Sequence, residues 1–256
     1  MNEENLINYY NKFNEDKRLT HRHGIVEFIT AKKYIDKYIN KKSKIIDIGA
    51  GTGKYSIKLF NEGYDVTAIE LIKHNLMTIK KNCPNLKSYQ GNAINLSKEL
   101  DNSYDLVLLF GPLYHLISFE DKVKALKEAK RIIKPNGIIM ISYYMNEYAI
   151  IKHGFIENKI LEAKKNNEID SNYHITPKDT DLYSMVRLED INKLNETVGL
   201  KRLEIISQDG PSDYIRSIIN KMDDITFNEY INYHLSICNR QELLGASSHV
   251  LDIVTK

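Results

Sequence analysis

Residues 44–53, with the sequence Lys-Ile-Ile-Asp-Ile-Gly-Ala-Gly-Thr-Gly, place three glycines at alternate positions directly after a β-branched run. The run predicts a short strand over 44–48, and the helical spacing of residues 55–60 predicts a helix beyond the glycines. Glycine lets the backbone turn sharply and lets a ligand approach, and the first turn of a helix offers unpaired N–H groups. The stretch therefore predicts a strand, a loop and a helix that bind a nucleoside-bearing ligand.

Two acidic residues flank this loop. Residues 65–69 form a second apolar run, and Glu70 ends it 19 positions after Gly51. A carboxylate at this place can accept both hydrogen bonds of a ribose diol. Asp47, two residues before Gly49, adds an anion at the mouth of the loop. This anion repels a pyrophosphate and suits a ligand that carries an ammonium group.

The spacing of the glycines separates this loop from two other nucleotide-binding loops. A dinucleotide fingerprint reads G-x-G-x-x-G, whereas here the third glycine comes one residue early and Lys54 stands where that fingerprint needs its last glycine. A phosphate-binding P-loop needs glycine at Ile48 and Ser or Thr at Tyr55. Because neither pattern is present, binding through a pyrophosphate is disfavoured.

Strands and helices alternate on both sides of the loop. The apolar spacing of residues 25–39 predicts an amphipathic helix before it. The elements expected after it are a helix at 71–81, a weak strand at 86–89, a central strand at 104–110, a helix with an apolar stripe at 123–133, a turn at 135–137 and a strand at 138–142. Repeated β-α-β units need right-handed crossovers. The expected fold class is therefore α/β, with a doubly wound parallel sheet and helices on both faces.

The regular alternation of strands and helices ends after Tyr143, and the segments that follow indicate how the chain is divided into parts. Residues 144–187 hold a helical stretch, a polar stretch and a strand-like segment at 181–188, which we interpret as a cap insertion. A helix at 190–198 and strands at 200–207 and 250–254 return to the core, with a helical insertion at about 208–246. The predicted parts are an N-terminal helical segment covering the ligand site (1–42), an α/β core (43–143), the cap (144–187) and the C-terminal part of the core (188–256).

Composition and charge narrow the class of partner. The 256 residues carry 36 Lys and Arg against 34 Asp and Glu, a net charge of +2. A protein that neutralises phosphates has a marked basic excess, so nucleic acid is disfavoured as a partner. Two cysteines, Cys83 and Cys238, are too few for a disulfide framework, and no apolar run approaches the roughly 18 residues of a membrane span. We expect a cytoplasmic protein that has no membrane segment, and the sequence leaves its oligomeric state open.

The glycine loop resembles the first motif of the class I S-adenosylmethionine-dependent methyltransferases, which reads D-x-G-x-G-x-G at the end of strand one. Four further elements agree in order, so that the resemblance covers about residues 43–142: Glu70, Gly91-Asn92-Ala93, Tyr104-Asp105-Leu106-Val107, and residues 131–137. Residues 9–19 and the sequence Gly-Ala-Ser-Ser-His at 245–249 are similar to a bacterial branch that acts on small molecules. The resemblance implies a mostly parallel seven-stranded sheet with helical cap insertions, and S-adenosyl-L-methionine as the cofactor.

The resemblance also implies which residues contact that cofactor. The loop packs on its methionine part and sugar, with Asp47 near the ammonium group and Glu70 on the ribose. Asn92 and Ala93 meet the adenine, and Phe110 lies under the reacting methyl group at the switch point of the sheet. Apart from the resemblance, Tyr9 and Tyr10 are candidates to close over the sulfonium, because aromatic faces attract a cation, and ordinary core packing is the alternative. The full expected set is Tyr10, Asp47, Gly49, Ala50, Gly51, Thr52, Gly53, Glu70, Leu71, Asn92, Ala93 and Phe110.

Two residues just past the fourth strand are the catalytic candidates. Tyr114 and His115 follow the sequence Phe-Gly-Pro-Leu at 110–113, beside the place where an acceptor must enter. Methyl transfer needs alignment and a deprotonated nucleophile, and histidine titrates near neutral pH, so His115 is the candidate base. A positioning or packing role for His115 is the alternative.

The other histidines do not predict a metal site. His234 and Cys238 are four residues apart, and His249 follows, but a zinc site needs about four ligands and no second pair at suitable spacing accompanies them. We therefore predict no metal and interpret these residues as core or pocket lining.

The predicted function is methyl transfer from S-adenosylmethionine to O, N or S of a small-molecule acceptor. Residues 110–113 do not resemble the N-P-P-Y or D-P-P-Y string of enzymes that methylate exocyclic amines of DNA bases, and Cys83 precedes the third strand instead of following the fourth, where cytosine C5 methylation needs a nucleophile. The alternatives left open are a non-catalytic S-adenosylmethionine-binding sensor and an RNA or protein methyltransferase. A nicotinamide-dependent oxidoreductase is disfavoured by the glycine spacing.

Overall fold

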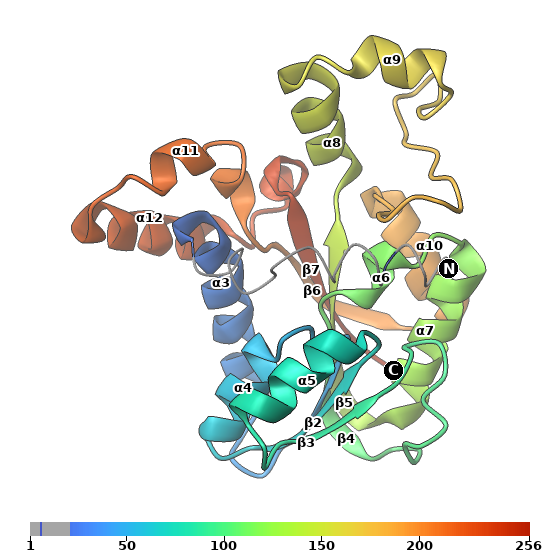
Figure 1. The fold of residues 1–256 in the computed structure, drawn as a ribbon, viewed down its shortest axis with the longest axis vertical. Coiled ribbons are helices and arrows are strands. Elements are labelled where there is room, and N and C mark those ends of the chain that lie inside the picture. Colours follow the sequence, from blue (N-terminus) through green and yellow to red (C-terminus); the bar gives the residue numbers. More distant parts are fainter. Residues whose placement is uncertain (1–5, 7–20) are drawn as a thin grey trace.

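A single twisted sheet forms the centre of the molecule. The computed structural model describes residue 6 and residues 21–256. In this part of the chain seven strands are ordered β3-β2-β1-β4-β5-β7-β6, and β7 is antiparallel to both of its neighbours (Figure 1). The strands are β1 (Lys44–Ile48), β2 (Asp65–Glu70), β3 (Lys87–Gln90), β4 (Tyr104–Leu109), β5 (Ile133–Tyr144), β6 (Lys201–Ser207) and β7 (His249–Thr255). The prediction of a doubly wound, mostly parallel seven-stranded sheet is confirmed.

Helices cover both faces of the sheet. Three lie on one face and two on the other (Figure 1): α3 (Arg22–Tyr38), α4 (Lys54–Asn61) and α5 (Lys73–Asn82), then α7 (Phe119–Ile132) and α10 (Leu188–Val198). Side chains of the central strand β4 alternate between the two cores: Leu106 and Leu108 face α3 and α4, and Val107 and Leu109 face α7. All four are fully buried, which explains the continuous apolar run of this strand.

Strand β5 is longer than the sequence predicts. Tyr104 pairs with Ile133 and Leu106 pairs with Ile138, so that residues 134–137 bulge out of a strand that continues past them. Asn136 has a positive φ of 63°, which asparagine tolerates better than most residues. The predicted turn at 135–137 is therefore a bulge within β5.

The expected strand at 181–188 is wrong. Val186 forms one isolated bridge with Met145, and α10 begins at Leu188. Both edges of β5 are already occupied, by β4 and β7, so this segment finds a partner only just past the end of that strand. Its alternating apolar residues instead bring Tyr183 and Met185 over the carboxyl edge of the sheet.

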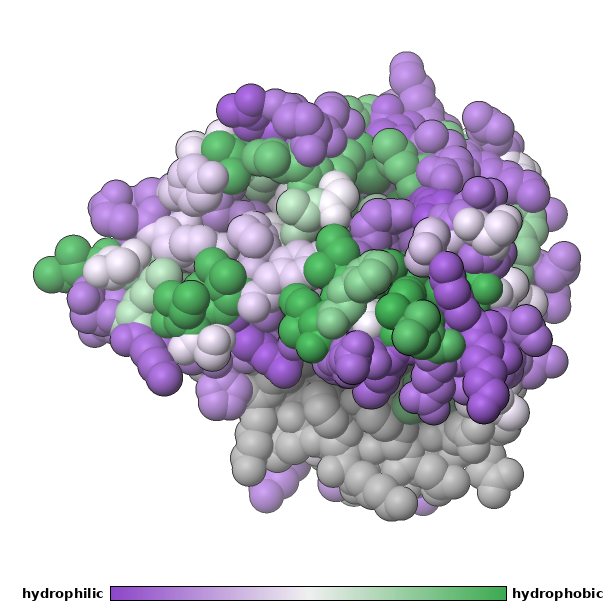
Figure 2. Space-filling model, turned by 90° about the horizontal axis from the view of Figure 1, so that it is seen from above, coloured by the Kyte–Doolittle hydropathy of each residue, from purple (hydrophilic) through white to green (hydrophobic). Residues whose placement is uncertain are grey.

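Two helical insertions extend beyond this edge, at the top and left of Figure 1. The elements, with the short helix α6 that follows β4, are α6 (Pro112–His115), α8 (Asn146–Ala149), π-helix η1 (Ile150–Ile156), α9 (Ile160–Lys165), η2 (Gly210–Ser212), α11 (Arg216–Ile219), α12 (Asp224–Ile237) and η3 (Gln241–Ala246). Phe155, Ile156 and Leu161, of the insertion that follows β5, are exposed. Figure 2 shows hydrophobic groups scattered over this face of the molecule. No helix in the described part of the chain has the length and apolar character that crossing a membrane requires.

Candidate functional site

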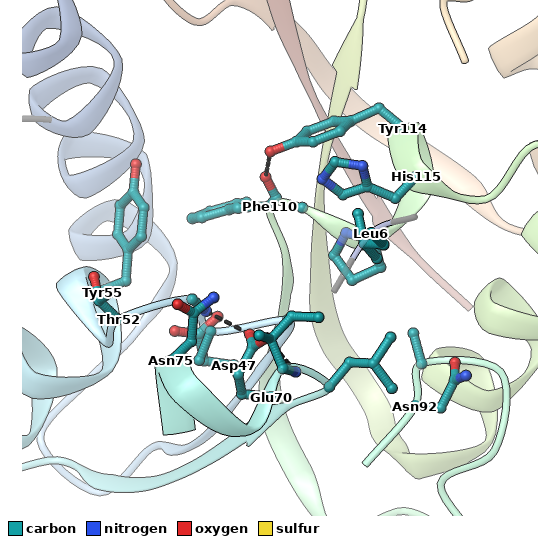
Figure 3. A pocket seen from close by; sticks show the side chains of 18 of the residues that line it. Leu6, Asp47, Thr52, Tyr55, Glu70, Asn75, Asn92, Phe110, Tyr114 and His115 are labelled. Carbon is teal, nitrogen blue, oxygen red and sulfur yellow. Dashed lines mark hydrogen bonds between the residues drawn. The ribbon is translucent and has the colours of Figure 1, made fainter. Parts of the chain in front are cut away.

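The ends of β1, β2 and β4 meet at the carboxyl edge of the sheet and surround a cavity, here called the first cavity. β1 and β4 are neighbours whose crossovers run in opposite directions, which makes this edge the switch point where open α/β sheets bind ligands. The residues expected from the sequence that line the first cavity are Asp47, Gly49, Ala50, Gly51, Thr52, Glu70, Leu71, Asn92, Ala93, Phe110, Tyr114 and His115 (Figure 3). Leu6, the one described residue before His21, lines it as well.

Glycine is required at positions 49 and 51 for different physical reasons. A Cβ on Gly49 would lie 2.7 Å from Cγ of Pro112, so packing against α6 requires glycine there. A Cβ on Gly51 would meet nothing within 4 Å, although its φ of +56° is one that other residues rarely adopt. Gly51 therefore keeps open space for a ligand at the backbone.

One expected contact does not line the first cavity, and another falls outside the described residues. Gly53 is absent from the lining: a Cβ there would lie 2.9 Å from Cδ1 of Ile57 and 3.0 Å from Cγ1 of Ile79, so this glycine lets α4 start against α5. Tyr10 lies outside the described residues. Its expected place over the cofactor remains a prediction.

Two buried carboxylates lie under the loop. Glu70 accepts hydrogen bonds from the N–H of Gly51 on Oε2 at 2.7 Å and from the N–H of Ile72 on Oε1 at 2.8 Å. Asp47 accepts a hydrogen bond from the hydroxyl of Ser56. Burial raises the pKa of Asp47 to about 6, and burial, with the nearby charge of Asp47, raises the pKa of Glu70 to about 7. No cationic side chain is among the causes of either shift, although Lys54 lines the same cavity.

This arrangement fits a cationic nucleoside. Beyond its bonds to two backbone N–H groups and to Asn75, Glu70 keeps acceptor capacity that a ribose hydroxyl can use. A positive ligand would stabilise both carboxylates, whereas a pyrophosphate would add negative charge to two groups already raised in pKa. Asn75, which the sequence analysis did not single out, also bonds Glu70 and lines the first cavity. Its place on the face of α5 that points to β2 was the available signal.

The side of the first cavity opposite the loop is aromatic. Phe110 ends β4 and packs edge-on against Tyr55, with ring centroids 4.7 Å apart. The hydroxyl of Tyr114 donates to the carbonyl of Phe110 at 2.9 Å (Figure 3). Nδ1 of His115 lies 2.8 Å from the carbonyl of Leu182, which can only accept, so Nδ1 carries the proton. Burial lowers the pKa of His115 to about 4, and the ring is therefore neutral at neutral pH.

A second cavity adjoins the first, and Glu27 and Tyr114 line both. Its volume is about 350 Å³, which suits a small molecule. Its walls come from segments far apart in the sequence: His23, Gly24, Glu27, Tyr114, Tyr144, Tyr148, Lys152, His153, Glu157, Tyr183, Met185, Asp209, Asp213, Arg216, Ser248 and His249.

His249 and Asp209 form the most connected polar group in the second cavity. Oδ1 of Asp209 accepts from the hydroxyl of Ser247 at 2.6 Å and from the N–H of His249 at 2.9 Å. Oδ2 accepts from the hydroxyl of Ser248 and lies 2.8 Å from Nδ1 of His249. Burial acts to raise the pKa of Asp209. The interaction with His249 and the hydrogen bonds outweigh burial and lower this pKa to about 2. The sequence analysis missed Asp209, whose signal was an acidic residue followed by glycine directly after a buried strand.

Glu27, Asp209 and His249 also lie close enough for a shared cation. Their possible ligand atoms all lie within 4.8 Å of one another. Each oxygen of Asp209, however, is already bonded by two protein donors, which completes its lone pairs. We interpret the three residues as a hydrogen-bonded acid–base cluster. Cys238, interpreted from the sequence as core or pocket lining, is buried and bonds Tyr34.

Comparison with known proteins shows which domain family the segment that carries the first cavity matches. A family model described as a methyltransferase domain matches residues 46–141, the segment that runs from β1 into β5. Residues 46–141 are a class I S-adenosylmethionine-dependent methyltransferase domain. S-adenosyl-L-methionine is the cofactor of this family, which agrees with the carboxylates and open glycine of the first cavity.

Relatives of the methyltransferase domain agree with this assignment. The chain is 33% identical over 115 residues to an uncharacterized methyltransferase-like protein of Schizosaccharomyces pombe, covering 44% of this chain and 41% of that protein. It is 30% identical over 104 residues to a glycine/sarcosine N-methyltransferase of Parasynechococcus marenigrum, covering 39% and 37%. The match thus spans about two fifths of either relative.

A solved structure shares the fold of most of the chain. A structure described as a S-adenosylmethionine-dependent methyltransferase of Methanosarcina mazei has a TM-score of 0.59 and 15% identity, and the match covers 87% of this chain and 96% of that one. At this identity the likeness concerns the fold, in which the cap insertions surround the edge that holds both cavities.

Proposed function

We propose that this protein transfers a methyl group from S-adenosylmethionine to O, N or S of a small molecule. The observation that carries the proposal is the pair of buried carboxylates, Asp47 and Glu70, with raised pKa values beside the open backbone of Gly51 in a methyltransferase domain. When bound, the cofactor supplies a methyl group on a positively charged sulfur. The carboxylates favour such a cation over a neutral or anionic ligand.

The roles of the cofactor residues follow from their positions. Glu70 binds the ribose hydroxyls, and Asp47 lies near the ammonium group. Asn92 and Ala93 hold the adenine beside Leu71. Phe110 forms the floor under the reacting methyl group, at the end of β4. The backbone of the loop, including Ala50 and Thr52, packs on the remaining parts.

The second cavity is the acceptor site in this proposal. It adjoins the first cavity through Glu27 and Tyr114, and its volume admits a small molecule rather than a folded macromolecule. Most of its walls come from the segments 1–42, 144–187 and 208–246, which supports their role as covers, and Tyr114, Ser248 and His249 of the core complete them. The glycine/sarcosine N-methyltransferase among the relatives supports a small acceptor.

In this proposal Tyr114, which lines both cavities, and His115, which lines the first, are positioning residues. The neutral ring of His115 keeps its proton on Nδ1 for the carbonyl of Leu182, which makes Nε2 a hydrogen-bond acceptor. A group with a pKa of about 4 holds a proton poorly at neutral pH. Of the two roles that the sequence left open for His115, positioning is therefore the one we propose.

The experiment that tests the proposal compares three ligands by thermal shift: S-adenosylmethionine, S-adenosylhomocysteine and NAD at matched concentrations. A ligand at 100 times its Kd adds about 2.7 kcal/mol, which raises Tm by roughly 5–10 °C in a chain of this length. We expect shifts with the two adenosyl-sulfur compounds and none with NAD. Small amines, phenols and thiols are then screened by product mass. A shift with NAD alone, or no shift at all, would overturn the proposal.

A further inference from the structure

The second cavity holds an acid–base pair, His249 and Asp209, to which binding of the cofactor gives no role. We propose that His249, oriented by Asp209, is the base that accepts a proton from an amine bound in this cavity. This inference rests on the proposed function, because it assigns the class of acceptor and the base of that reaction.

The hydrogen bonds fix which nitrogen of His249 takes the proton. Asp209 is ionised, and an ionised carboxylate can only accept hydrogen bonds. Nδ1 of His249, 2.8 Å from Oδ2, is therefore the donor. Nε2 is then the basic nitrogen of the ring. Ser247 and Ser248 hold the carboxylate from its other lone pairs, so that Asp209 and with it the imidazole have one orientation.

Two carboxylates lie close to the ring of His249, where they can stabilise the charge that the ring gains with a proton. Oε2 of Glu27 lies 4.0 Å from Nδ1, so two buried carboxylates stabilise positive charge on this imidazole. His115 lies in a different setting, since its ring bonds a backbone carbonyl and burial lowers its pKa to about 4. Of these two histidines, His249 is the one built to receive a proton.

The walls of the second cavity indicate the class of acceptor. Tyr144 stacks on His249 with ring centroids 5.2 Å apart, and Tyr114 lies 6.0 Å away. Aromatic faces beside buried carboxylates attract cations. Basic side chains of the same walls lie beside carboxylates: His153 lies 3.1 Å from Glu157, and the guanidinium of Arg216 lies 3.8 Å from Asp213. The interior therefore favours an ammonium group.

The proton transfer balances without a further reactant. An N–H bond of the ammonium breaks, its proton moves to Nε2 of His249, and the electron pair stays on the acceptor nitrogen, which becomes nucleophilic. His249 then releases the proton to solvent. The titratable and charged residues that line the second cavity with His249 are His23 and Glu27 of α3, Tyr114 of α6, Tyr144 of β5, Tyr148 of α8, Lys152 and His153 of η1, Glu157 after it, Tyr183, both Asp209 and Asp213 after β6, and Arg216 of α11.

The first test is nuclear magnetic resonance of ¹⁵N-histidine protein saturated with S-adenosylhomocysteine. Three probes share a ring and chain length but differ in charge: phenethylamine, 2-phenylethanol and 3-phenylpropionate. We expect the Nδ1–H tautomer of His249, and binding of phenethylamine at least about tenfold tighter than the others with shifts of the His249 signals. Tighter binding of phenylpropionate, or the Nε2–H tautomer, would overturn the inference. So would binding of Mn²⁺ that His249→Gln abolishes, because a metal would then occupy the cluster.

The second test compares variants on methylation of phenethylamine. His249→Gln should lower kcat by about 100-fold or more at neutral pH, while affinity for S-adenosylhomocysteine changes less than twofold. Asp209→Asn should lower kcat and alter its pH profile, because the ring loses its orienting charge. His74→Gln, an exposed histidine of α5, is the matched control and should retain full activity. Full activity of His249→Gln refutes the inference alone, whereas failure of wild type to bind S-adenosylhomocysteine refutes the proposed function.

Discussion

The two cavities hold buried carboxylates whose pKa values move in opposite directions. In the first cavity burial raises the pKa of Asp47 to about 6 and of Glu70 to about 7. In the second, the charge of His249 and four donors lower the pKa of Asp209 to about 2. In the first site a cationic ligand would be the partner of both carboxylates, whereas in the second His249 becomes the positive partner of Asp209 when it takes a proton. One is built for binding a cation and the other for handling a proton.

The largest expected effect is a loss of cofactor affinity when the first cavity is filled, measured against a control that introduces the same backbone strain elsewhere. Gly51 and Gly63 both have positive φ, and neither would place a Cβ within 4 Å of another atom. Valine at either position should cost about 1–2 kcal/mol of stability. Only Gly51→Val fills the first cavity, so it should weaken S-adenosylmethionine binding by at least about 100-fold in calorimetry, with Gly63→Val as control. Equal affinities in the two variants would contradict the assigned site.

Cofactor affinity should depend on pH through Glu70. Only the ionised carboxylate accepts two ribose hydrogen bonds, so affinity should fall about tenfold from pH 8 to pH 6, through its pKa of about 7. Stability of the ligand-free protein should move the other way: the folded state holds this proton more tightly than the unfolded state, so Tm rises as pH falls from 7 toward 4.5. Glu70→Gln should remove both trends. Affinity that is constant between pH 6 and 8 would argue against this role.

A smaller effect is expected for His115 than for His249. His115→Asn can still donate to the carbonyl of Leu182, so methylation of an acceptor found by the screen should fall less than tenfold, mostly through KM. The measurement is steady-state kinetics with both substrates varied. A loss of 10²-fold or more in kcat would return the role of base to His115.

The smallest expected effect concerns the stability of the central sheet. Tyr104 and Tyr143 are both fully buried on the neighbouring strands β4 and β5. The hydroxyl of Tyr104 donates to Glu99, whereas the hydroxyl of Tyr143 has no hydrogen-bond partner in the described structure. Tyr104→Phe should cost about 1–2 kcal/mol in denaturant unfolding, and Tyr143→Phe should be neutral or stabilising by up to about 1 kcal/mol. Equal losses would indicate that Tyr143 has a partner.

The sequence by itself determined the half of the molecule that contains the first cavity. The residues from Asp47 to Thr52 and Glu70 follow consecutive strands, and the carboxyl ends of neighbouring parallel strands must meet at one edge. The glycine spacing, a local property of the backbone, disfavoured a pyrophosphate, and the resemblance of this motif to the class I methyltransferases implied the cofactor class. The burial that raises the pKa of Glu70 could not be read from the chain, because it depends on packing from all sides.

Only the tertiary structure decided the second cavity. Glu27, Tyr114, Asp209 and His249 lie on α3, on α6, after β6 and at the start of β7, and the antiparallel direction of β7 is what brings its first residue to the edge where the parallel strands end. The sequence motif Gly-Ala-Ser-Ser-His was visible, but its partner Asp209 is 40 residues away. Spacing along a chain reports contacts within a strand–loop–helix unit. A site closed by insertions exists only once the sheet has set their relative positions.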